Sequence, residues 1–198
     1  MLEYALLAAC LEHGVNHDLL RAIARQESAG KQNAFYINRW NQGQFKNLSL
    51  DEAVMVVETM VEEGYTVDVG LMGINSINIE RFGLTVREAF DPCTNVNLGE
   101  TILHENIMHA ESKGETGDAA LQAALSMYNT GSVTRGFKNG YVDKVWRYYV
   151  QSGFHEANES GLDVPWGNNL TRVETENNEL HWTQKESVQC TQKLTLPR

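Results

Sequence analysis

The sequence is poor in proline, cysteine and basic residues, and each shortage excludes a class of protein. Three prolines among 198 residues leave long stretches free to form helices, because proline interrupts the helical hydrogen-bond ladder. Sixteen lysines and arginines stand against 26 acidic residues, giving a net charge of −10, and no basic stripe neutralises the phosphates of a nucleic acid. No apolar run approaches the roughly 20 residues of a membrane-spanning helix. These shortages predict a mainly helical domain that binds no nucleic acid and spans no membrane.

The three cysteines, Cys10, Cys93 and Cys190, show no CxxC spacing, which argues against a zinc ribbon or a thioredoxin-type site. The sequence also has no HExxH, P-loop, GxGxxG or GxSxG motif. We therefore expect neither a metal nor a cofactor. Composition leaves two states open for Cys10 and Cys93, a long-range bridge or two buried reduced thiols.

Hydrophobic periodicity predicts a helical domain over residues 1–151, followed by a polar, flexible tail over 152–198. The apolar stretch 5–11 lies between two glutamates and indicates an amphipathic first helix, not a signal peptide; an exported protein would need a leader that is not in this chain, or another route. A stretch rich in aromatics and amides, 33–46, predicts a short hairpin or loop. The expected helices are 2–12, 16–29, 51–63, 97–112, 118–130 and 141–150.

Glu27 is the strongest catalytic candidate. In a helix that begins at Asn16, Leu20, Ile23 and Glu27 share one face. A carboxyl group on an apolar face loses solvation, which raises its pKa and keeps a proton available near neutral pH. The alternative is a solvated glutamate near a helix end.

The segment from Asp68 to Asn75, DVGLMGIN, is too rich in glycine for a helix interior and too apolar for a solvated loop. Glycine allows close approach of the backbone to a neighbour. We therefore expect this segment to pack closely on another part of the protein or on a ligand.

Four motifs follow in order: Glu27-Ser28, GLMGIN at 70–75, ALSMYNTG at 124–131 and YVDKV at 141–145. This series resembles the lysozyme-like soluble lytic transglycosylases, with their ES, GLMQ, AYN and YV motifs. The stretch EAVMVVETMVEEGYTVDVGLMGIN, with FDPC farther on, is similar to the specialised lytic transglycosylases of type IV secretion and conjugative transfer systems. The resemblance implies a mainly α (α+β), lysozyme-like fold and a periplasmic enzyme that cleaves peptidoglycan locally, without a cofactor.

The resemblance also implies roles for individual residues. Glu27 would act as acid and then as base, leaving a 1,6-anhydromuramyl end. A bridge between Cys10 and Cys93 is implied by the oxidising periplasm. One departure is Gly73, where the family has glutamine, and we expect it to weaken or retune substrate contact. The implied substrate-binding residues are Ser28, Gly70, Leu71, Met72, Tyr128, Asn129 and Tyr141.

Two alternatives remain open. Asp68 as a second carboxylate would hold a water and make the protein a muramidase acting by hydrolysis, although a turn or capping residue is the preferred interpretation of Asp68. The protein would otherwise be a glycan-binding assembly factor, with the tail after Ser152 contacting components of a secretion machine. An intact Glu27 favours catalysis over this second alternative.

Overall fold

A computed structural model of the chain describes residues 15–40, 45, 48–151, 170–174 and 180–184. The helix expected over 2–12 lies outside the described residues. The described helices are α2 (His17–Ser28), α3 (Leu50–Glu62), α4 (Ser76–Arg81), α5 (Val86–Phe90), α6 (Pro92–Ser112), α7 (Gly117–Thr130), α8 (Arg135–Lys138) and α9 (Tyr141–Gln151). The strands are β1 (Phe35–Ile37), β2 (Val67–Val69), β3 (Ile74–Asn75), β4 (Leu170–Glu174) and β5 (Leu180–Gln184). The fold is mainly α with a small antiparallel sheet, as predicted.

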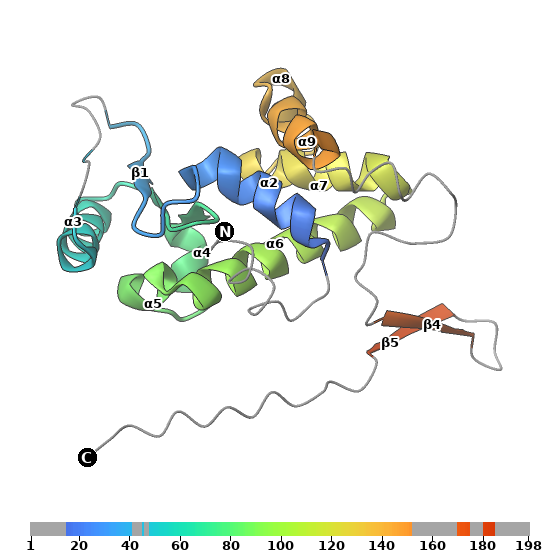
Figure 1. Cartoon of the computed structure of the whole chain (residues 1–198), viewed down its shortest axis with the longest axis horizontal. Coiled ribbons are helices and arrows are strands. Elements are labelled where there is room, and N and C mark those ends of the chain that lie inside the picture. The colour runs from blue at the N-terminus through green and yellow to red at the C-terminus, as the bar shows by residue number, and fades with distance from the viewer. Residues whose placement is uncertain (1–14, 41–44, 46–47, 152–169, 175–179, 185–198) are drawn as a thin grey trace, which may run out of the picture.

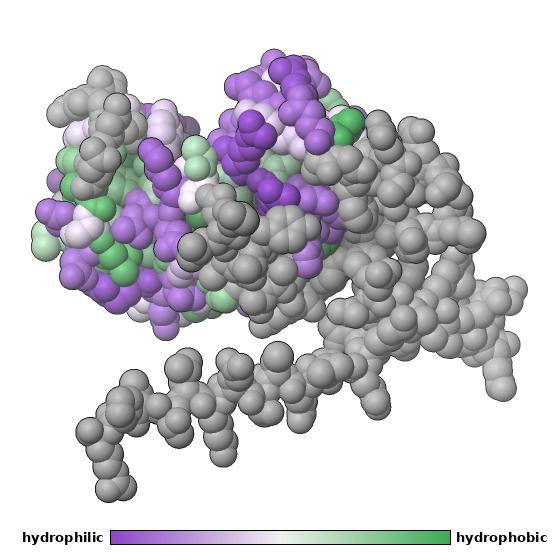
Figure 2. All heavy atoms as spheres, viewed as in Figure 1, coloured by the Kyte–Doolittle hydropathy of each residue, from purple (hydrophilic) through white to green (hydrophobic). Residues whose placement is uncertain are grey.

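Helix α6 is the longest described helix, and the other helices of this part are arranged around it. Helix α7 packs along α6, and α2 packs on both α6 and α9. In Figure 1, α8 and α9 lie on one side of this group, whereas β1 and α3 lie on the other. The space-filling view shows a notch between these two sides (Figure 2). One continuous apolar core, which includes Leu19, Ile23, Leu103 and Leu125, joins the elements.

Helix α2 forms where its caps predict it. The Asn16 side chain accepts hydrogen bonds from the backbone N–H groups of Asp18 (2.8 Å) and Leu19 (3.3 Å), which satisfies donors that lack partners at a helix start. The helix ends at its C-cap residue Ala29, whose backbone has a left-handed conformation with φ of 53°. These two caps place Glu27 in the last turn of α2.

Residues 33–46, expected as a short hairpin or loop, contribute strand β1 to a sheet formed with distant segments. Strand β1 pairs with β2, about thirty residues later in the chain, and β2 pairs with β3 in the order β1-β2-β3. In this register Asp68 lies opposite both Tyr36 and Asn75. The hairpin is therefore formed by β2 and β3 around the glycine-rich segment, which brings that segment to the helices.

Two helix starts also differ from expectation. Helix α6 begins at Pro92, not near residue 97, because the Asp91 side chain caps it by accepting from the Thr94 N–H (2.9 Å). Helix α7 begins at Gly117 with Thr116 as its N-cap, so Asp118 lies in the first turn. Within the tail, β4 and β5 pair as antiparallel strands; the short alternation in these two segments was too weak to predict them.

No helix among the described residues is long and apolar enough to cross a bilayer. The described part of the chain also holds no cluster of three or more histidine, cysteine or acidic side chains suited to a metal ion. Cys93 is disulfide-bonded. Its partner lies outside the described residues, so the pairing with Cys10 stays a prediction.

Candidate active site

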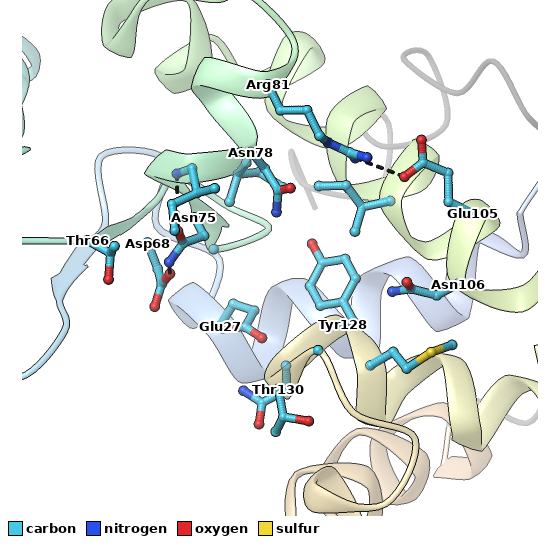
Figure 3. A pocket seen from close by; sticks show the side chains of 17 residues that line it. Glu27, Thr66, Asp68, Asn75, Asn78, Arg81, Glu105, Asn106, Tyr128 and Thr130 are labelled. Carbon is cyan, nitrogen blue, oxygen red and sulfur yellow. Dashed lines mark hydrogen bonds and ion pairs between the residues drawn. The ribbon is translucent and has the colours of Figure 1, made fainter. Parts of the chain in front are cut away.

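A cleft of about 510 Å³ opens at the end of α2, between the sheet and helices α4, α6 and α7. Figure 3 shows Thr66 and Asp68 at one end, Arg81 and Glu105 at the other, and Tyr128 between them. Polar side chains from several elements line the cleft, among them the asparagines Asn75, Asn78, Asn106 and Asn129. Amide and hydroxyl groups of this kind suit a ligand rich in hydroxyl and amide groups.

Glu27 lines this cleft from the last turn of α2. Its Oε1 accepts a hydrogen bond from the Tyr141 hydroxyl at 2.5 Å. The pKa of Glu27 is raised from 4.5 to about 7; burial is the main cause, the Tyr141 bond opposes the rise, and the negative charge of Asp68 adds to it. A carboxyl group with this pKa is well suited to donate and then accept a proton near neutral pH.

Asp68 lies in β2 and lines the same cleft. Its carboxylate accepts hydrogen bonds from the side-chain amides of Asn38 (3.0 Å) and Asn75 (2.6 Å). Burial raises the pKa of Asp68, while these two bonds lower it. Asp68 is therefore neither a surface turn residue nor a backbone cap. The interpretation of Asp68 as a turn or capping residue, which the sequence favoured, was wrong.

A buried asparagine fixes the glycine-rich turn between β2 and β3. The Asn95 Oδ1 accepts from the Met72 N–H at 2.7 Å, and its Nδ2 donates to the carbonyls of Val69 (3.0 Å) and Ala89 (2.7 Å). Gly70 has φ of +78°, and a Cβ there would lie 2.3 Å from Asn95 Nδ2. The close packing expected for this segment is thus contact with the protein itself.

Gly73 lies directly against the catalytic candidate. Its φ is +59°, and a Cβ built on it would lie 2.7 Å from Glu27 Oε2 and 3.1 Å from Glu27 Cβ. Any side chain at position 73 therefore requires the Glu27 carboxyl group to move. We therefore expect the absence of the glutamine to affect the position of the acid itself as well as substrate contact.

Two tyrosines support this arrangement. The Tyr128 hydroxyl donates to the Met72 carbonyl at 2.8 Å, which ties α7 to the glycine-rich turn. Burial is the main cause that raises the pKa of both Tyr128 and Tyr141 well above the ordinary value, and the Glu27 charge adds to it. Both hydroxyls therefore stay protonated. Tyr128 lines the cleft, whereas Tyr141 is buried behind Glu27.

Of the other residues predicted to bind substrate, some line the cleft and some do not. Asn129 lines the cleft and its Oδ1 accepts from the Asn139 side chain at 2.8 Å. Ser28 is buried and its hydroxyl donates to the Ala24 carbonyl at 2.9 Å, so it belongs to the helix end. Leu71 and Met72 are buried in the core. With Gly70, they support the turn and do not line the cleft.

Sequence reasoning missed the residues at the far end of the cleft. Asn78 and Arg81 come from α4, and Glu105 and Asn106 come from α6. The spacing of Asn78 and Arg81, three apart, is that of one helix face. No pattern in the sequence indicated that this face, and the polar side of α6, border the same space as Glu27.

Residues 5–148 match the family described as Transglycosylase SLT domain. The chain belongs to this family. It is 41% identical over 97 residues to Protein virB1 of Agrobacterium fabrum, covering 48% of this chain and 38% of that protein. It is 36% identical over 104 residues to Type IV secretion system protein virB1 of Brucella abortus, covering 50% of this chain and 44% of that protein. No solved structure matches the sequence.

The match to the SLT family contains the whole candidate site. Every cleft-lining residue, together with Tyr141 and Asn95, falls within residues 5–148. The alignments span about two fifths of the length of the curated relatives. Strands β4 and β5 lie beyond the matched residues.

Proposed function

We propose that this SLT-family protein is a lytic transglycosylase that cleaves the β-1,4 bond between N-acetylmuramic acid and N-acetylglucosamine in peptidoglycan. The observation that supports this most directly is the Glu27 carboxyl group, which lines the cleft and has its pKa raised to about 7. The product is a 1,6-anhydromuramyl end, formed without water.

Glu27 performs both proton transfers in this reaction. It first protonates the glycosidic oxygen as the bond to C1 breaks, and the sugar's own N-acetyl group stabilises the positive charge that develops. Glu27, now a carboxylate, then takes the proton from the C6 hydroxyl as O6 attacks C1. The acid is regenerated, so a single carboxyl group with a pKa near the working pH is sufficient.

The two oxygens of Glu27 have different surroundings that suit this cycle. Oε1 is held by the Tyr141 hydroxyl, which fixes the plane of the carboxyl group. Oε2 accepts no hydrogen bond from the described residues and lies against Gly73, on the wall of the cleft. Oε2 is therefore the oxygen that carries the transferred proton.

The names of the relatives support a proposal for the cellular role. The Brucella relative is named as a type IV secretion system protein. We propose that this protein opens the cell wall locally for a secretion or conjugation apparatus, in the periplasm. Components of that apparatus are its expected partners besides the glycan strands.

Hydrolysis is a second candidate reaction, because Asp68 lines the cleft that contains Glu27 and its charge acts on Glu27. In that reaction Asp68 positions a water that attacks C1. The products then carry reducing ends and are heavier by one water.

Mass spectrometry of the fragments released from purified peptidoglycan tests the proposal, with Glu27→Gln as the matched variant. We expect 1,6-anhydromuramic ends from the wild type and a loss of at least about 1,000-fold in rate for Glu27→Gln. Reducing ends would identify a hydrolase and make Asp68→Asn the next variant. Wild-type-like release by Glu27→Gln would refute the role of Glu27, and no release by either protein would indicate a glycan-binding factor.

A further inference from the structure

The end of the cleft away from Asp68 is formed by an ion pair. Arg81, in the last turn of α4, donates to Glu105 of α6 at 2.8 Å. The guanidinium carbon also lies 4.4 Å from the centre of the Phe82 ring, which restrains its plane. Arg81 is the only basic side chain among the described residues that line the cleft.

This ion pair is accessible to a ligand. The Arg81 and Glu105 side chains are 48% and 46% exposed, and an ion pair of this kind adds little to the stability of a fold. Its position at the mouth of a substrate cleft, in a chain with a net charge of −10, is therefore better explained by a ligand than by folding.

Two amide side chains at the same end have unused hydrogen-bonding groups. Asn78 is three residues before Arg81 on α4, and Asn106 follows Glu105 on α6. Both are half-buried and line the cleft, and neither side chain forms a hydrogen bond with the part of the chain that the structure describes. Figure 3 shows both amides on the side of the cleft where Arg81 and Glu105 lie.

We propose that Arg81 binds a carboxylate of the peptide stem on the muramic acid, so that the cleft selects glycan strands whose stems carry free carboxylates. This inference rests on the proposed peptidoglycan substrate. A strand whose stem carboxylates are blocked as amides offers hydroxyls and amides, which Asn78 and Asn106 match, but no negative charge. The stem peptide brings free carboxylates, and a guanidinium group binds a carboxylate through two parallel hydrogen bonds.

Glu105 has the opposite effect on this binding. In the absence of substrate it holds the guanidinium group in place, and it competes with the stem carboxylate for the same donors. Removing the Arg81 charge therefore weakens stem recognition, whereas removing the Glu105 charge strengthens it. An ion pair with a purely structural role predicts the same direction of change for both variants.

The experiment measures binding by fluorescence anisotropy, in the Glu27→Gln background, which leaves the strands uncut. The probes are labelled soluble glycan strands with their peptide stems and the same strands after the free carboxylates of the stems have been converted to amides. The readout is the ratio of the two dissociation constants. We expect Arg81→Ala to lower the selectivity for strands with free stem carboxylates about tenfold, and Glu105→Gln to raise it.

Arg87→Ala is the matched control. Arg87 forms a more exposed ion pair with Asp51 at 2.6 Å, with side chains 54% and 82% exposed, and neither residue lines the cleft. This variant should keep the selectivity of its parent.

Three results would overturn the inference: equal weakening of both strands by Arg81→Ala, no change in that variant, or a loss of selectivity in Glu105→Gln. The proposed reaction is tested separately, because these binding ratios do not depend on cleavage. A wild type that releases no fragments but shows the expected ratios would refute the catalytic role and retain stem recognition.

Discussion

The two ends of the cleft are built in opposite ways. Around Glu27, Tyr141 and Asn95 are buried and hydrogen-bonded to their neighbours. At the other end, the pair of Arg81 and Glu105 is exposed. We propose that the chemistry depends on this rigid backing of buried, hydrogen-bonded groups around Glu27, whereas recognition depends on surface side chains that exchange partners.

The rigid backing has a physical reason. Proton transfer needs the donor oxygen within hydrogen-bond distance of the reacting oxygen, and small displacements of a catalytic group reduce the rate strongly. A backing whose polar groups are all paired resists such displacement. A recognition surface has the opposite requirement, because its groups must release water or a neighbour when the substrate binds.

The largest effect on stability is expected for Asn95→Ala. This change leaves the buried Met72 N–H without its acceptor and removes two hydrogen bonds from Asn95 Nδ2 to backbone carbonyls. We expect the free energy of unfolding to fall by about 3 kcal/mol or more, measured by urea denaturation. Asn78→Ala, at the open end, is the matched control and should cost less than about 0.5 kcal/mol. Similar costs for the two variants would contradict the contrast between the two ends.

The next effect is a gain of stability in Glu27→Gln that depends on pH. Folding raises the pKa of Glu27 from 4.5 to about 7, so the folded protein binds this proton more tightly than the unfolded chain. Below pH 4.5 the group is protonated in both states and adds no cost. Between pH 4.5 and 7 the ionisation of this group progressively lowers the free energy of unfolding of the wild type. Above pH 7 the free energy of unfolding is lower by the full amount of about 3 kcal/mol.

Thermal or urea unfolding of Glu27→Gln and wild type at several pH values measures this difference. Glutamine keeps an acceptor for Tyr141 and carries no charge, so the variant should become the more stable protein as the pH rises. The exposed Glu58 of α3 provides the control, since Glu58→Gln removes a carboxylate that the cleft does not bury. If the difference in free energy of unfolding between Glu27→Gln and wild type stays constant from pH 5 to 8, burial does not raise the pKa of Glu27.

The helices and the acid were predictable from the sequence because their signals are local. Asn16 caps α2, Leu20 and Ile23 mark its buried face, and the same periodicity places Glu27 on that face. The motif order then led to Tyr128 and Tyr141. Each of these inferences needs only residues within one helix, or a match to a known series of motifs.

The remainder of the site depends on contacts between distant segments. Pairing of β1 with β2 turns Asp68 into a cleft residue, and nothing near Asp68 in the sequence indicates that strand partner. Asn95 lies 23 residues from the Met72 N–H that it binds. Ser28 shows the converse error, because its motif suggested substrate contact whereas its hydroxyl is used by the helix end.

The smallest effect is expected for Gly73→Ala. This variant tests whether the rigid backing fixes the position of the Glu27 carboxyl group. The added Cβ would lie 2.7 Å from Glu27 Oε2, so the carboxyl group must turn toward the open cleft. There it is better hydrated, and its pKa falls toward the ordinary value. The protonated form is then lost at lower pH, which moves the alkaline limb of the pH–rate profile downward, and we expect kcat to fall about tenfold.

Gly83→Ala separates this effect from backbone strain. Gly83 has φ of +69°, close to that of Gly73, and a Cβ there meets no atom within 4 Å. Both variants should lose roughly 1 kcal/mol of stability from alanine in the left-handed region. Only Gly73→Ala should shift the pH–rate profile, because only Gly73 touches the acid. An unshifted profile in Gly73→Ala would mean that Glu27 tolerates a side chain at position 73 without moving, and that the missing glutamine affects substrate contact alone.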